Sequence, residues 1–176
     1  MVKTIGIDPG LAGTGVGIVK GIGLKVDSYS FSSVATSKSE SLPNRLEQIY
    51  SSLLAILRSE RPDKMIVEEI FSLGKYPKSA IVLGKVVGVV LLAGQQLDIP
   101  VAEVSVSEAK QILTGNGNAS KQQLEKSVRQ MLKIAEPIRP YHISDALGLA
   151  LIGLFRYNQN LNPSAFPKGK QNDDFS

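Results

Sequence analysis

The segment VKTIGIDPGLAGTGVG, residues Val2 to Gly17, predicts a short strand that ends at a carboxylate and then turns back at once. Its β-branched residues favour a strand up to Asp8, Pro9 cannot continue the ladder, and a second strand-like run begins at Gly13. Asp8 is therefore expected at the carboxyl end of a strand, where α/β folds place much of their chemistry. On this segment alone, a functional carboxylate and a turn aspartate that binds backbone N–H groups are equally supported.

The composition of the 176-residue chain limits its organisation and chemistry. The length suits a single domain, which we place at residues 1–158, before a polar tail at residues 159–176 that we expect to be disordered. Without cysteine the chain has no disulfide, no thiolate metal ligand and no cysteine nucleophile. Lys and Arg outnumber Asp and Glu by 20 to 16, which is compatible with a polyanionic partner. No uncharged apolar run of about 18 residues and no signal-peptide pattern is found, so we expect a soluble, cytoplasmic protein without membrane contact.

Hydrophobic periodicity predicts an α/β domain with a mixed five-stranded sheet and helices packed on both faces. The first three strands follow one another closely, as in an antiparallel meander. Serine residues are expected to cap three of the helices, and Ser105 and Ser120 stand three residues before Glu108 and Gln123, as in a capping box. After the first two strands, we expect strands at Leu24–Val34, Lys64–Glu69 and Ile99–Val104, and helices from Ser41 to Arg61 and at Ser79–Leu97, Ser105–Leu113, Ser120–Ile134 and His142–Asn158.

The long helix expected at Ser79–Leu97 contains two glycines, Gly84 and Gly88, four residues apart. Each glycine costs a helix roughly 1 kcal/mol relative to alanine, so we expect another backbone to pack closely against this pair. An ordinary core helix with close packing is the simpler explanation of the two glycines.

Several side chains with metal-binding chemistry stand near the ends of predicted elements. The strand KMIVEE ends in Glu68 and Glu69, whose side chains alternate, so only one of them can face the same way as Asp8. His142, the single histidine, and Asp145 are three residues apart and hence neighbours on one helix face. Taken singly, each of these two residues is more commonly structural. Together the set offers hard oxygen ligands and one imidazole, which suit Mg²⁺ or Mn²⁺, and paired cations roughly 4 Å apart catalyse phosphodiester hydrolysis.

Over about residues 2–157, the sequence resembles the RuvC family of Holliday-junction resolvases. The order and spacing of several motifs carry this resemblance, whereas the first motif alone would not. The motifs are GIDPG at Gly6–Gly10, VEEIF at Val67–Phe71, SAIVLGKVVGV at Ser79–Val89, EAKQILTGNGNASKQQL at Glu108–Leu124 and HISDALGLAL at His142–Leu151.

The resemblance implies a ribonuclease H-like fold, a homodimer and a role in homologous recombination and DNA repair. It implies that two opposed strands of a four-way DNA junction are nicked symmetrically, with two Mg²⁺ ions in each active site and Mn²⁺ as a substitute. The long helix from Ser79 resembles the family's dimer helix, so close packing between two copies would explain Gly84 and Gly88. A branch-migration helicase complex is the partner that the resemblance adds to the DNA junction.

The resemblance also assigns roles to individual residues. Asp8, Glu68, His142 and Asp145 match the acidic metal site, and Glu68 is chosen over its neighbour because it lies three residues before the loop phenylalanine. We expect Asp8 to bridge two cations, Glu68 and Asp145 to hold one each, and His142 either to ligate a cation or to position the attacking water. Many members have aspartate where this chain has His142. The DNA contacts expected are Phe71, which stacks on bases, and Lys75 and Lys78 in the loop that it begins. Lys110 and Lys121 are expected near the scissile phosphate, and Lys121 is also counted as catalytic.

Three alternatives stay open at this point. A ribonuclease H-like RNA-processing nuclease of the YqgF type would share the acidic strands, but the loop around Phe71 and the long helix favour the resolvase. Half of an actin-like ATPase would share GIDPGLAGTG, although the chain is too short for the two lobes of that fold. A junction-binding module without catalytic activity is disfavoured by the pair of His142 and Asp145.

Overall fold

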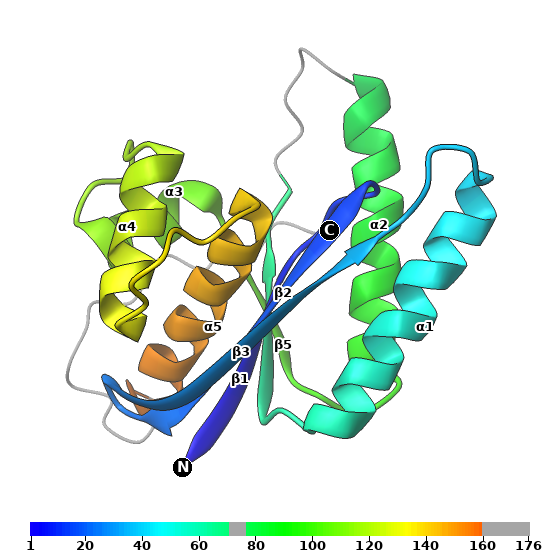
Figure 1. Ribbon diagram of the computed structural model, residues 1–176. Helices are drawn as coiled ribbons and strands as arrows, with labels where there is room; N and C mark the ends of the chain where they lie inside the picture. The colour runs from blue at the N-terminus through cyan, green and yellow to red at the C-terminus, as the bar shows by residue number, and fades with distance from the viewer. Residues whose placement is uncertain (71–76, 160–176) are drawn as a thin grey trace, which may run out of the picture.

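The computed structural model describes residues 1–70 and 77–159 of the chain. Figure 1 shows a three-layer arrangement in which one sheet lies between two groups of helices. The strands are β1 (Val2–Asp8), β2 (Gly13–Ile22), β3 (Lys25–Ala35), β4 (Lys64–Glu68) and β5 (Val101–Val104). The helices are α1 (Leu42–Glu60), α2 (Pro77–Gln95), α3 (Val106–Thr114), α4 (Lys121–Leu132) and α5 (Tyr141–Gln159).

The sheet has the strand order β3-β2-β1-β4-β5 and mixes both pairing directions. The pairs β1–β2 and β2–β3 are antiparallel, so the predicted meander is confirmed. The pairs β1–β4 and β4–β5 are parallel. Helices α1 and α2 cover one face of the sheet, and α3, α4 and α5 lie on the other side (Figure 1), which confirms the predicted mixed five-stranded sheet with helices on both faces.

Alternation along β1 decides which residues meet each layer of helices. Ile5 and Ile7 are fully buried in the core that includes α1 and α2. Thr4 points to the other face, where its hydroxyl donates a 2.7 Å hydrogen bond to the Ala150 carbonyl of α5. By the same two-residue period, Asp8 ends β1 on the face covered by α5.

Glycines allow the α5 backbone to lie directly on the sheet. A Cβ at Gly6 would meet the Ala146 carbonyl oxygen at 2.0 Å, and a Cβ at Gly17 would meet the Leu147 nitrogen at 2.5 Å. Because side chains at these positions would push the helix away, α5 is held close to the ends of β1 and β2. This contact determines where the first two turns of α5 place their side chains.

The predicted helix caps are confirmed, with one difference. Ser41 accepts from Asn44 N–H, and Ser120 forms a complete capping box with Gln123. At α3, Ser105 accepts from the Glu108 N–H, but the Glu108 carboxylate is paired with Arg156 of α5. The predicted capping box of α3 is therefore only half formed, because an ion pair between helices holds its glutamate.

The expectation for Gly84 and Gly88 is wrong within the single chain. A Cβ at either position would meet nothing within 4 Å, so no other part of the described chain packs closely there. The α2 segment Lys78–Gln95 is long and apolar enough to cross a membrane by length and composition, yet its Val86, Val90 and Ala93 are fully buried in the domain core. The opposite face of α2 exposes large apolar side chains, with Ile81 62% and Leu92 52% exposed, beside the exposed Lys85.

The predicted disordered tail from residue 159 lies almost entirely outside the described residues, and α5 ends at Gln159. Phe71 and Lys75 also lie outside the described residues.

Candidate active site

Strand pairing brings two carboxylates to the same edge of the sheet. Ile7 of β1 is the register partner of Val67 of β4, so the residues that follow them, Asp8 and Glu68, end neighbouring parallel strands. Ile66 belongs to the core on the α5 side, and the two-residue period places Glu68 on that side as well. Glu69 instead lines a hollow with Ile81 and Gly84 of α2. The choice of Glu68 as the partner of Asp8 therefore agrees with the strand geometry.

Asp145 reaches the same edge from α5. It lies in the second turn of this helix, one residue before Ala146, whose carbonyl rests against Gly6 of β1. Asp8, Glu68 and Asp145 line one pocket of about 140 Å³. Two lysines, Lys110 of α3 and Lys121 at the start of α4, line it as well. The remaining walls are apolar aliphatic side chains, those of Val104, Val106, Ala109, Leu113, Leu124 and Leu149.

Burial and mutual repulsion make these carboxyl groups difficult to ionise together. Burial, followed by the charges of Glu68 and Asp145, raises the pKa of Asp8 from 3.8 to about 8, although Lys121 opposes the rise. Burial and the charge of Asp145 raise the pKa of Glu68 from 4.5 to about 7, although the charges of Lys121 and Lys110 oppose the rise. The pKa of Asp145 is also raised by burial. Such a cluster needs compensating positive charge to be fully ionised at neutral pH.

The donor atoms of the pocket fit a hard cation. Asp145 Oδ1 is buried and lacks a hydrogen-bond partner among the described residues. Within the same residues, the Asp8 carboxylate accepts no hydrogen bond, so the reading of Asp8 as a turn aspartate is not supported. No three His, Asp or Glu side chains of the described segments are close enough to enclose one ion by themselves. Mg²⁺ is commonly held by one or two carboxylates, with water and phosphate oxygens as its other ligands, and this donor set suits that pattern.

His142 lies beside this pocket but is not among the residues that line it. Its ring contacts β2, where a Cβ at Gly13 would be 3.2 Å from Cε1, and its Nε2 is 2.8 Å from the Ser33 hydroxyl of β3. Burial and the charge of Lys121 lower the pKa of His142, which favours the neutral imidazole. The structure thus brings three of the four predicted metal ligands together and places the fourth against the edge strand.

Ser33 did not stand out in the sequence. It belongs to a run of serines in β3 and is separated from His142 by 109 residues, so no local pattern links the two. Only the register of β3 on β2, which pairs Ser33 with Gly15, reveals the contact.

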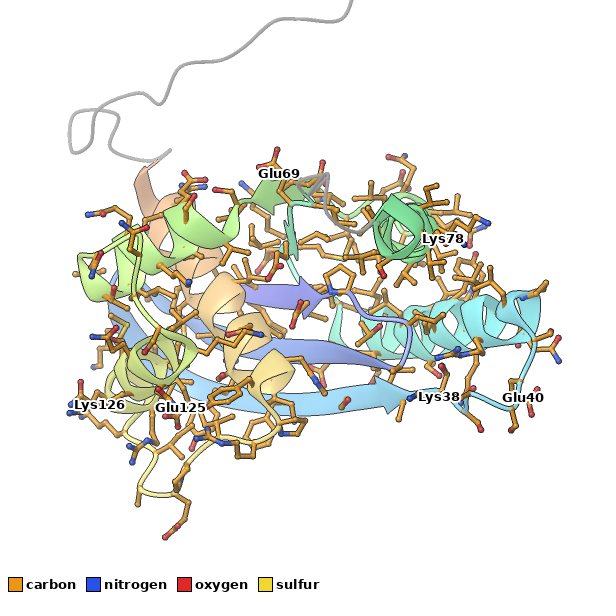
Figure 2. The ribbon with its side chains drawn as sticks, turned by 90° about the horizontal axis from the view of Figure 1, so that it is seen from above. Lys38, Glu40, Glu69, Lys78, Glu125 and Lys126 are labelled. Atoms are coloured by element: carbon orange, nitrogen blue, oxygen red, sulfur yellow. The ribbon has the colours of Figure 1, made fainter. Side chains whose placement is uncertain are left out.

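The lysines expected to contact DNA divide into two groups. Lys110 and Lys121, which the resemblance places near the scissile phosphate, line the pocket. Lys78 is exposed in the first turn of α2 and lies across the molecule from α4, which carries Lys126 (Figure 2). Lys78 is not among the residues that line the pocket.

Comparisons with known proteins match nearly the whole chain. The family model described as "Crossover junction endodeoxyribonuclease RuvC" matches residues 4–153. Proteins of that name from Desulforamulus reducens and Carboxydothermus hydrogenoformans are 38% and 39% identical to the chain. The first alignment covers 84% of this chain and 90% of the relative, and the second covers 88% and 96%. The solved structure of T. thermophilus RuvC in complex with Holliday junction substrate has a TM-score of 0.82 and 32% identity, and covers 91% of this chain and 97% of that one.

Proposed function

Since the chain belongs to the RuvC family of crossover junction endodeoxyribonucleases, we propose that it resolves four-way DNA junctions by paired nicks in two opposed strands. Membership confirms the predicted ribonuclease H-like fold and the predicted nuclease activity, and it excludes the ATPase alternative. The observation that carries the proposal is the convergence of Asp8, Glu68 and Asp145 with two lysines in one pocket. Family membership also supports a role in homologous recombination and DNA repair.

Asp8, Glu68 and Asp145 would hold the divalent cations, which we propose are two Mg²⁺ ions with Mn²⁺ as a substitute. When bound, such ions activate water and stabilise both the attacking and the leaving oxygens of a phosphodiester. Asp8 is the candidate shared ligand because the charges of both Glu68 and Asp145 act on it. The buried, unpartnered Oδ1 of Asp145 supports its assignment as a ligand.

Lys110 and Lys121 are proposed to bind the scissile phosphate. Both line the carboxylate pocket from α3 and α4, and their charges oppose the rise that burial causes in the pKa values of Glu68 and Asp145. A cation fixed beside a phosphate stabilises the extra negative charge that develops in the transition state. His142 would serve the same step either as a ligand or as the group that orients the attacking water.

The homodimer remains a proposal, which the outer face of α2 supports. This face combines exposed Ile81 and Leu92 with Gly84 and Gly88, whose surroundings are open within the single chain. We further propose that Phe71, Lys75 and Lys78 contact the DNA arms, that the protein works with a branch-migration helicase complex, and that it acts in the cytoplasm.

The test is cleavage of a mobile four-way DNA junction, a matched linear duplex and an RNA–DNA hybrid, with Mg²⁺, Mn²⁺ or EDTA and 5′-labelled strands. Paired nicks that need metal and occur on the junction alone are expected. Cleavage of the hybrid alone would transfer the protein to the RNA-processing alternative, and junction binding without cleavage in either metal would indicate the silent module. Asp8→Asn should bind the junction yet fail to cut it, and wild-type cleavage by this variant would refute the site assignment.

A further inference from the structure

The only histidine of the chain is bonded to the edge strand of the sheet. His142 Nε2 lies 2.8 Å from Ser33 Oγ, and the two residues belong to α5 and β3. The ring and backbone of His142 rest on β2, where a Cβ at Gly15 would meet the His142 carbonyl oxygen at 2.0 Å. Because Gly15 is the register partner of Ser33, the imidazole reaches across the glycine to the serine hydroxyl.

This contact leaves one ring nitrogen free to ligate a cation or to bind water. A neutral imidazole carries one N–H donor and one lone pair, and a serine hydroxyl can serve either as acceptor or as donor. With Nε2 engaged by Ser33, Nδ1 has no hydrogen-bond partner among the described residues. If Nε2–H donates to Ser33 Oγ, Nδ1 keeps its lone pair. If the serine O–H donates to Nε2 instead, Nδ1 carries the proton and can neither ligate a cation nor accept a bond from water.

We propose that Ser33 is a positioning residue, which holds His142 in the Nε2–H tautomer and so leaves a lone pair on Nδ1. The inference rests on the proposed function, in which His142 ligates a cation or orients the attacking water. Both roles need a lone pair on the ring. Histidines that bind metals usually donate their other N–H to an oxygen acceptor, and this second contact sets both the tautomer and the ring orientation.

The serine run of β3 supplies a matched control. Ser33 pairs with Gly15, which faces α5, whereas Ser32 pairs with Val16, which is fully buried in the core on the side of α1 and α2. Ser32 is also exposed, so Ser32→Ala removes the same hydroxyl one residue away without affecting the His142 side of the strand. Ser33→Thr restores a hydroxyl at the position that Ser33→Ala empties.

The direct test is the ¹⁵N spectrum of the imidazole in tag-free, metal-free, full-length protein near neutral pH. Because the chain has one histidine, the two-bond ¹H–¹⁵N correlations of the ring need no assignment. The wild type is expected to show a protonated Nε2 and an unprotonated Nδ1. Ser33→Ala should move both nitrogens toward the shifts of a free neutral histidine, in which the two tautomers exchange and Nε2–H is the major form, while Ser33→Thr and Ser32→Ala resemble the wild type. A wild type with Nδ1 protonated, or a Ser33→Ala spectrum identical to it, would overturn the proposal.

Cleavage kinetics test whether the tautomer matters for the reaction. Ser33→Ala should lower kcat on the junction about 10-fold, the size typical of residues that orient a metal ligand, with little change in KM. Ser33→Thr should recover most of the loss, and Ser32→Ala should cleave like the wild type. An undiminished kcat in Ser33→Ala would refute the positioning role even if the tautomer is as expected. If the wild type itself does not cleave, the proposed function fails, and the spectrum still decides the tautomer.

Discussion

Gly6 of β1 and Ala146 of α5 approach so closely that a Cβ on the glycine would stand 2.0 Å from the alanine carbonyl oxygen. The next atoms it would meet are the Ala150 nitrogen at 2.5 Å and the Leu149 Cβ at 2.8 Å. Because all three atoms belong to α5, a methyl group at this position could be accommodated only if the helix moved. The distance between β1 and α5 is therefore set by this glycine, and with it the distance between the carboxylates of Asp8 and Asp145.

Gly6→Ala should move α5 outward and impair both stability and catalysis. Overpacking of this kind is expected to lower the unfolding free energy by about 3 kcal/mol. The cleavage rate should fall further than the fraction of unfolded protein accounts for. Urea denaturation and single-turnover cleavage of the same preparation measure the two effects. Gly117→Ala is the control, since its Cβ would meet nothing closer than the Ser107 oxygen at 3.4 Å. A fully stable, fully active Gly6→Ala variant would contradict this account of the helix contact.

Glu68 and Glu69 are adjacent in sequence, but their side chains serve opposite faces of the sheet. Glu68 lines the pocket of Asp8, whereas Glu69 lines the hollow beside α2. Glu68→Gln keeps the shape of the side chain but removes a charge that two cations would need, so cleavage should fall by at least about 100-fold, a loss of roughly 3 kcal/mol in transition-state binding. Glu69→Gln should stay within several-fold of the wild type. Equal losses in both variants, measured on a labelled junction, would refute the assignment of the strand faces.

The sequence predicts the order of the elements because the strand and helix periods, the serine caps and the prolines are local signals. The pocket of Asp8, Glu68 and Asp145 is also within reach of the sequence, since strand ends and helix faces follow from those same periods. The contact of Ser33 with His142 is not, because it depends on the register between β2 and β3. The surroundings of Gly84 are equally beyond local reasoning, since a glycine in a helix signals close packing without naming the partner.

The raised pKa of Asp8 predicts how the stability of the metal-free protein varies with pH. Between the ordinary pKa of 3.8 and the folded-state pKa of about 8, the folded protein holds a proton that the unfolded chain has released. Stability therefore decreases as the pH rises through this window. Asp8→Asn removes the titrating group, so in EDTA this variant should have a higher Tm than the wild type above pH 8. The corresponding gain in unfolding free energy is on the order of a few kcal/mol, and it should shrink toward pH 4.

Excess Mg²⁺ supplies the internal control for this comparison. Because a ligand stabilises the state that binds it, the wild type should gain Tm with added metal and the Asp8→Asn variant should gain much less. Thermal denaturation at several pH values, with EDTA or Mg²⁺, measures both effects. A variant that is less stable than the wild type at high pH in EDTA would show that the Asp8 carboxylate is not destabilised by burial and by its acidic neighbours.

The open surroundings of Gly84 make it a test of the proposed dimer. In a monomer a Cβ at this position meets nothing within 4 Å, so Gly84→Ala should stabilise α2 by roughly 1 kcal/mol through helix propensity alone. If a second copy packs its backbone against α2, the added methyl group should instead weaken the dimer, and sedimentation equilibrium should show a dissociation constant raised about 10-fold, or roughly 1.4 kcal/mol. Ser59→Ala, at an exposed position of α1, changes helix propensity in the same direction and should leave association unchanged. An unaltered dimer in Gly84→Ala would mean that this face of α2 is not where two copies meet.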